Sequence, residues 1–272
     1  MVDDIRHHFG HTEKRACTVM GMSRSSYRYT PKHEGDLKLI LRMRQLAQEK
    51  PRYGVRRLHL LLKREGLVIN HKRTERLYKK EGLAIRTKKS KKQSNVIRMA
   101  LPVPGAINEQ WAMDFIHDTT SAGRRLKCLT IIDIYSRECL AIRVDGSISA
   151  KAVIDTMGRL IEIRGKPFSI ITDNGPEFTS NVFHAWADEH KIRLYFIRPG
   201  KPMENAFIES FHGRFRDECL NLHRFVTIQK ARGIIEHWRL EYNTKRPHSS
   251  LNGLTPIEFA GEMLLTKCIQ NV

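Results

Sequence analysis

The stretch SIITDNGPEF, residues 169–178, contains an apolar, β-branched run that ends at Thr172 and Asp173, before the turn formers Asn174 and Gly175. Strands commonly end on such turn formers. The aspartate is less ordinary, because it stands where a buried strand still buries its side chains, and an unpaired carboxylate is costly to desolvate. The stretch therefore predicts a buried strand whose last carboxylate needs a partner.

The segments around this strand predict an α/β fold. Three strand-like runs at short spacing come first, at 110–120, 126–137 and 139–148. Helical and strand-like runs then alternate, at 149–165, 168–173, 180–191, 192–198 and 204–220. The order β-β-β-α-β-α-β-α favours a mixed sheet with helices on its faces, and a last helix is expected over 227–242.

The charge of the chain is concentrated in its first third. The 272 residues carry a formal charge of +19, with 26 Lys and Arg against nine Asp and Glu in residues 1–100, and 22 against 20 in the rest. A basic module joined to a nearly neutral one indicates polyanion binding by the first, and its helical periodicity favours nucleic acid over a merely solvated face.

Targeting signals are not evident. No run approaches the roughly 18 apolar residues of a membrane span, and the start, MVDDIRHHFG, lacks the apolar core of a signal peptide. The five cysteines are scattered without a C-x-x-C pair, which favours free thiols in a reducing compartment. We expect a cytoplasmic protein without a membrane partner.

Residues 1–33 are predicted to form a helix-turn-helix-like segment. Thr12 can cap a first short helix that ends at Gly21, and Ser23 can cap a second. In a helix-turn-helix the second helix enters the major groove, which makes Arg24 and Arg28 predicted DNA-binding residues. Any helical hairpin would give a similar pattern.

Residues 34–85 are predicted to form a second basic helical domain, again of helix-turn-helix type. A helix over 36–50 is followed by two helices that stop at Gly66 and Gly82, the second capped by Asn70. The predicted DNA-binding side chains of this pair are Arg56, Arg57, Lys72, Arg73 and Arg76.

The lysine-rich segment 86–104 has no periodicity and is predicted to be a basic linker. Its Lys88 and Lys89 either track the phosphate backbone or belong to a plain tether. The catalytic core is then expected over 105–265, with its C-terminal helix and tail.

Three acids are predicted to converge in that core. In a sheet of this order the first strand is central and the fourth lies beside it. Asp114 stands midway along the first strand, and Asp173 ends the fourth, where open α/β sheets place ligands. Glu209 lies on the helix face opposite the apolar stripe. The predicted partner of Asp173 is therefore a divalent cation shared with the other two acids.

Carboxylate ligands without a histidine or thiolate set indicate Mg²⁺ or Mn²⁺. Two such ions can activate an attacking oxygen and stabilise a leaving one in phosphoryl transfer. Spacing alone does not distinguish these three acids from others in the core. The alternative interpretation is that they only cap helices and turns and bind no metal. The competing acids are Asp118, Asp133, Asp155, Glu177 and Glu204.

Several motifs together resemble a known family. WAMDF, TDNGPEF and GKPMENAFIESFHGRFRDE, with 35 residues between Asp173 and Glu209, are similar to the core of retroviral-integrase-like DDE transposases. Arg216, seven residues after Glu209, matches the basic residue of that motif. The flanking stretches RYGVRRLHLLLKREGLVINHKRTERLYKKEGL and YNTKRPHSSLNGLTPIEFA resemble the second-frame (OrfB-type) transposase of the bacterial insertion-sequence-three family.

The resemblance implies an RNase H-like fold with Asp114, Asp173 and Glu209 as metal-binding acids. It also implies nicking at the ends of an insertion element and transfer of the freed 3′-hydroxyl to a second phosphodiester. Asn205 and Arg216 would position DNA. His212 lies on the same helix face, where it either contacts DNA or is an ordinary surface histidine.

The family further implies double-stranded DNA, namely the terminal repeats and the target, as partner. A frameshift fusion to a first-frame protein and a homo-multimer on DNA are also implied. His7 and His8 lack matching cysteines, so the zinc module of retroviral integrases is not expected.

Two other functions fit part of the sequence. A repressor with an inactive core would use the same basic first third, but would not need convergent acids. A general RNase H-like nuclease would use the same acids, but would not need basic helical pairs suited to duplex DNA. The basic loop RPHSSL, 246–251, either contacts phosphate or ties the last helix to the sheet.

Overall fold

The computed structural model describes residues 1–29, 34–85, 104–198 and 205–270. Its core is a five-stranded mixed sheet in the order β3-β2-β1-β4-β5. The strands are β1 (Gln110–Thr119), β2 (Arg125–Asp133), β3 (Cys139–Asp145), β4 (Ser169–Thr172) and β5 (Arg193–Phe196). β1 is central with β4 beside it, as the sequence predicted, and it is antiparallel to β2 and parallel to β4.

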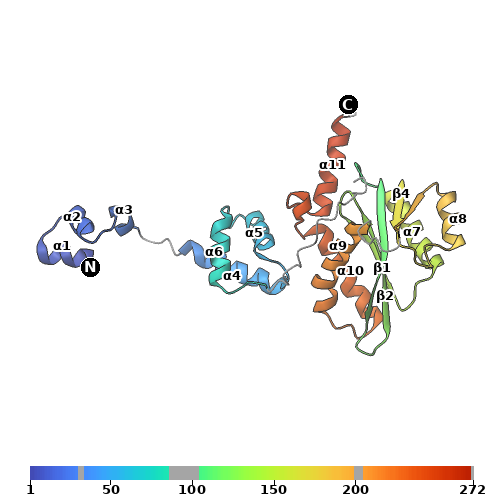
Figure 1. Ribbon diagram of the computed structural model, residues 1–272, viewed down its shortest axis with the longest axis horizontal. Helices are drawn as coiled ribbons and strands as arrows, with labels where there is room; N and C mark the ends of the chain where they lie inside the picture. Colours follow the sequence, from blue (N-terminus) through green and yellow to red (C-terminus); the bar gives the residue numbers. More distant parts are fainter. Residues whose placement is uncertain (30–33, 86–103, 199–204, 271–272) are drawn as a thin grey trace.

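Helices cover both faces of the sheet (Figure 1). One face packs against α7 (Ala150–Arg164) and α8 (Asn181–Glu189), and the other against α9 (Ala206–Glu218) and α10 (Ile228–Thr244). Ser149, Ser180 and Thr227 cap α7, α8 and α10 with their hydroxyl oxygens. These boundaries agree with the predicted helices, and the arrangement is the expected RNase H-like one.

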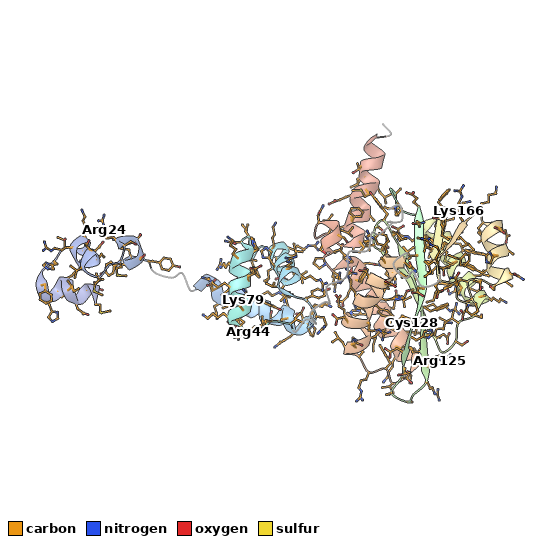
Figure 2. The ribbon with its side chains drawn as sticks, in the orientation of Figure 1. Arg24, Arg44, Lys79, Arg125, Cys128 and Lys166 are labelled. Carbon is orange, nitrogen blue, oxygen red and sulfur yellow. The ribbon has the colours of Figure 1, made fainter. Side chains whose placement is uncertain are left out.

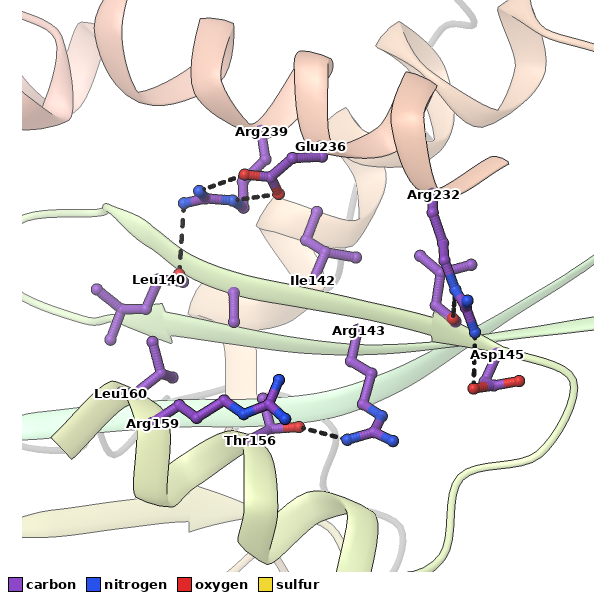
Figure 3. Close-up of a pocket in the computed structure, with 12 residues that line it drawn as sticks. Leu140, Ile142, Arg143, Asp145, Thr156, Arg159, Leu160, Arg232, Glu236 and Arg239 are labelled. Carbon is purple, nitrogen blue, oxygen red and sulfur yellow. Dashed lines mark hydrogen bonds and ion pairs between the residues drawn. The ribbon is translucent and has the colours of Figure 1, made fainter. Parts of the chain in front are cut away.

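Two arginines from α10 bind backbone carbonyl oxygens of the edge strand β3, which are then not available for pairing with another strand. Arg239 donates to the carbonyl oxygens of Cys139 and Leu140, at 2.9 and 3.3 Å, and Arg232 donates to that of Val144 at 2.8 Å (Figure 3). An open strand edge is a template for unwanted pairing. The contacts therefore protect this side of the core.

The helices before the core form two units. The first contains α1 (Val2–Phe9), α2 (Glu13–Val19) and α3 (Arg24–Tyr27), with Thr12 and Ser23 as the predicted caps. The second contains α4 (Glu34–Glu49), α5 (Val55–Arg64) and α6 (His71–Lys80), with Asn70 accepting from the Lys72 backbone N–H at 2.9 Å. The second unit has its own apolar core, built on Leu39, Met43, Leu58, Leu62 and Leu77.

Two helices were not predicted. Besides α1, the chain forms α11 (Pro256–Gln270) after the 3₁₀ turns η2 (Leu220–Leu222) and η3 (Ser249–Leu251). The signal for α11 was present: Thr255 accepts from the Glu258 N–H at 3.2 Å, and the Glu258 carboxylate accepts from the Thr255 N–H at 2.8 Å. This is a capping box, with Pro at the first helical position.

In the part of the chain that the structure describes, no helix is long and apolar enough to cross a membrane. Four free cysteines lie buried there, at positions 17, 128, 139 and 219.

Candidate active site

The central strand holds Asp114 among apolar neighbours. Its side chain is 23% exposed, and its Oδ1 accepts from the backbone N–H of Phe115 at 2.7 Å. Burial raises the pKa of Asp114 to about 7, against the opposing effect of the Phe115 N–H, and the negative charges of Asp173 and Glu209 raise it further. The three predicted acids are therefore close enough for their charges to act on one another.

Asp173 directly follows β4 and is held by the turn after it. Its Oδ1 accepts from the Gly175 N–H at 3.1 Å. A Cβ at position 175 would lie 3.1 Å from the same oxygen and 3.5 Å from the Phe178 ring. Because Gly175 has no Cβ, it leaves room for the Asp173 carboxylate, in addition to allowing the turn.

Glu209 lies on α9, whose opposite face packs into the core through Ile208, Phe211 and Phe215. Glu209 is exposed, and it pairs with no cation among the described residues. One turn earlier, the Asn205 side chain is buried at 4% exposure, and neither its amide nitrogen nor its oxygen has a hydrogen-bond partner among the described residues. A buried amide without partners is rare, and this one lies next to the acids.

His212 contacts the central strands. Its Nε2 lies 2.7 Å from the Thr130 hydroxyl, which donates to the carbonyl oxygen of Asp114 at 3.0 Å, so Nε2–H is the donor to Thr130. Its Nδ1 lies 3.6 Å from the Asp114 carboxylate. Burial and the nearby Arg216 charge lower the pKa of His212 to about 4. The neutral ring thus links α9 to the strand that carries Asp114, and its predicted DNA contact stays a prediction.

Arg216 lies beside a groove of about 610 Å³. Its guanidinium donates to the carbonyl oxygen of His117 at 3.2 Å and is otherwise exposed. The groove is also lined by Phe115, His212 and Asn221. A fixed guanidinium in an open groove next to the acids suits a phosphate oxygen.

The charge of the three acids calls for a cation, and their oxygen donors suit Mg²⁺ or Mn²⁺. Within the described ranges, however, no group of three His, Cys, Asp or Glu side chains lies close enough to hold an ion in this conformation. The acids approach one another without forming a closed site.

Several competing acids have structural partners. Asp133 is fully buried and accepts from the N–H groups of Asn108 and Ser136, at 2.8 and 2.7 Å. Glu177 pairs with Lys127 at 2.5 Å. Asp118 accepts from the Thr119 N–H and Asp155 is exposed on α7, while Glu204 lies outside the described residues.

The predicted DNA-binding residues of the helical units differ in their surroundings. Arg24, labelled in Figure 2, and Arg56 and Lys72 are exposed, and no ion pair joins them to described residues. The others have carboxylate partners: Arg28 pairs with Glu13, Arg73 and Arg76 with Asp36, and Arg57 with Glu218. Lys88 and Lys89 lie outside the described residues.

The loop residue Arg246 is one that sequence reasoning left undecided. It is 2% exposed and makes a bidentate ion pair with Glu218, at 2.7 Å for both contacts. Arg246 thus ties the loop to the end of α9 rather than to the sheet, and a phosphate contact by the rest of the loop stays a prediction. Trp111 and Trp238 are buried in the core.

Comparisons with known proteins agree with this architecture. Residues 105–202 and 190–256 match models of the integrase core domain, and residues 34–91 match an HTH-like domain. The insertion element IS407 31.7 kDa protein of Burkholderia multivorans is 46% identical over 260 residues, 95% of this chain and 94% of that protein. The insertion element IS476 39.2 kDa protein of Xanthomonas euvesicatoria is 43% identical, over 94% of this chain and 75% of that protein.

Among solved structures, an intasome of simian T-cell lymphotropic virus in complex with a PP2A regulatory subunit has a chain of similar fold. The TM-score is 0.54 at 15% sequence identity, covering 80% of this chain and 74% of that one. At this identity the likeness concerns the fold alone.

Proposed function

This chain belongs to the insertion-sequence-three family of transposases, and on that premise we propose that Asp114, Asp173 and Glu209 are the catalytic acids of its DNA transposition and integration. The observation that carries the proposal is the position of Asp114 on the central strand, near enough to Asp173 and Glu209 for repulsion from their negative charges to raise its pKa. A pure repressor would gain nothing from that repulsion.

The proposed reaction is nicking at an element end and attack of the freed 3′-hydroxyl on a second phosphodiester. Mg²⁺ or Mn²⁺, as two ions held by the three acids, would supply charge for the attacking and leaving oxygens. Asp114 stands midway along β1 and Asp173 directly follows β4, so the sheet fixes both, whereas Glu209 stands on a packed helix. The protein thus contributes two rigid ligands and one whose position depends on α9.

Asn205 and Arg216 are proposed to hold the DNA against these acids. The Asn205 amide has an unused donor and acceptor, and Arg216 offers donors to a phosphate oxygen in the groove. The exposed Arg24, Arg56 and Lys72 are proposed to contact phosphates farther along the duplex. Transfer between two DNA ends also needs more than one subunit, so we propose a homo-multimer on DNA, with a first-frame fusion partner.

The test uses end-labelled duplex carrying the terminal repeat of the element, with Mg²⁺ or Mn²⁺. Wild-type protein should nick at the element boundary, and Asp173→Asn should bind the duplex without nicking it. Asp155→Asn is the matched control, because Asp155 is exposed on α7 and has no ion pair among described residues. Nicking by Asp173→Asn would refute the assignment of the acids.

Two outcomes would favour the other functions. Duplex binding without nicking, also by the first-frame fusion, would support the repressor. Faster cleavage of RNA–DNA hybrid than of duplex would support the general nuclease.

A further inference from the structure

Glu218, at the carboxyl end of α9, is surrounded by two arginines from distant parts of the chain. Arg246, in the loop after α10, grips both carboxylate oxygens at 2.7 Å. Arg57, from α5 of the helical unit, donates to Glu218 Oε1 at 3.0 Å. One carboxylate therefore joins the helical unit, the helix that carries Glu209, and the RPHSSL loop.

The pairing with Arg246 already neutralises Glu218. The Glu218 and Arg246 side chains are 6% and 2% exposed, and a buried carboxylate in such a place requires a partner of this kind. Burial opposes the charge on Arg246, but the bidentate contact outweighs it and raises the pKa of Arg246 above its ordinary value. Arg246 is therefore the structural partner, and Glu218 does not need Arg57 for its own neutrality.

Arg57 is held less firmly. Its side chain is 30% exposed, and burial, followed by the like charge of Arg246, lowers the pKa of Arg57. A cavity of about 600 Å³ also lies between the helical unit and the core, lined by Tyr53, Glu218 and Arg246. The contact between the two units thus depends on a few polar pairs rather than on a sealed apolar interface.

Other ion pairs also join the helical unit to the core, and one of them, between Arg64 and Glu258 of α11 at 2.7 Å, lies away from α9 and α10. Arg52 pairs with Asp217 of α9 at 2.5 Å, and Lys50 pairs with Glu241 of α10 at 2.6 Å. Glu218 itself lies nine residues after Glu209, about 14 Å along the helix axis at 1.5 Å per residue. A shift of the docked unit therefore acts on the far end of the helix that places Glu209.

We propose that Arg57 and Arg246 are positioning residues that act through Glu218, docking the basic helical unit onto the helix that carries Glu209. DNA held by the helical unit is thereby coupled to the placement of Glu209 against Asp114 and Asp173. This inference rests on the function proposed above for those three acids. It assigns Arg57 to the core, although sequence alone placed it among the DNA contacts.

The test compares Arg57→Gln with Arg42→Gln in the full chain. Arg42 is 31% exposed and makes a bidentate pair with Glu65, at 2.8 and 2.7 Å, but both residues belong to the helical unit. The control therefore removes an Arg–Glu pair whose arginine is as exposed as Arg57, without touching the contact with the core.

Two quantities separate positioning from DNA binding: the affinity for terminal-repeat duplex, and the single-turnover nicking rate at saturating protein. Arg57→Gln should keep its affinity and lose nicking rate on the order of tenfold, the usual size of a coupling between sites. Arg57→Lys, which keeps a charge near Glu218, should recover much of that rate. Arg42→Gln should match wild type in both quantities.

Three results would overturn the proposal. Weaker binding with an unchanged saturated rate would make Arg57 a DNA contact. Equal loss in Arg42→Gln would make the effect one of stability. An Arg57→Gln rate equal to wild type would exclude the coupling.

Small-angle scattering of the DNA-free protein gives a readout that does not depend on nicking. The radius of gyration should grow in Arg57→Gln and stay unchanged in Arg42→Gln, because only the first loses one of the ion pairs between the helical unit and the core. If wild type fails to nick in Mg²⁺ and Mn²⁺, the proposed function fails. An unchanged radius in Arg57→Gln would instead refute the docking role itself.

Discussion

Replacing Asp114 by Asn should stabilise the metal-free protein at pH 8. The folded protein raises the pKa of this carboxyl from 3.8 to about 7, through burial first and the charges of Asp173 and Glu209 after it. Between these two values the folded state binds more protons at Asp114 than the unfolded chain does. Stability is therefore lost as pH rises through this range, and the loss is complete above the folded pKa.

The size of the effect follows from the two pKa values. A difference of about 3, at about 1.4 kcal/mol for each, corresponds to about 4 kcal/mol in favour of the neutral side chain at pH 8. Asn keeps an oxygen that can accept from the Phe115 N–H, so that hydrogen bond is retained. For a core of this size the gain corresponds to roughly 10 °C in Tm.

Urea unfolding followed by tryptophan fluorescence is a suitable assay, because all three tryptophans lie in the core, at positions 111, 186 and 238. With EDTA present, Asp114→Asn should exceed wild type in free energy of unfolding at pH 8 and match it near pH 4. Asp155→Asn should show neither effect. A difference that stays constant from pH 5 to pH 8 would refute the reasoning, because it could not come from titration of Asp114.

Three further substitutions test the surroundings of the site. Gly175→Ala should displace the Asp173 carboxylate and reduce nicking more than duplex binding, as measured by single-turnover cleavage; equal losses in both would contradict this. Arg246→Leu leaves the Glu218 carboxylate buried with a weaker partner, so urea unfolding should show a loss of about 3 kcal/mol. Thr255→Ala removes the cap of α11 and should cost about 1 kcal/mol in the same assay, with no change in nicking.

The strand and helix pattern was largely predictable from local sequence. Alternating apolar runs and turn formers gave the five strands in order, and capping residues such as Ser149 and Asn70 gave helix starts. The place of the fourth strand beside the first followed from their order, and it brings Asp173, at the end of the fourth, to the strand next to Asp114. The third acid, Glu209, followed from the apolar stripe on the other face of its helix.

Sequence alone could not separate acids by their partners. Asp114 and Asp133 both lie in apolar strands, yet Asp133 is fully buried and satisfied by Ser136 and Asn108, while Asp114 faces two other carboxylates. The difference depends on which residues approach from other elements, and no local pattern contains that information.

The amino-acid sequence by itself thus determined the α/β core, the basic helical units before it and the family to which they belong, because these depend on periodicity, composition and short motifs. Only the tertiary structure decided which arginines pair with carboxylates of the core and which stay exposed. Arg57 and Arg56 are adjacent and chemically identical, but one meets Glu218, 161 residues away, and the other is exposed. Helix rotation and the contact between the units decide which guanidinium meets a carboxylate, and both are set by packing across the whole chain.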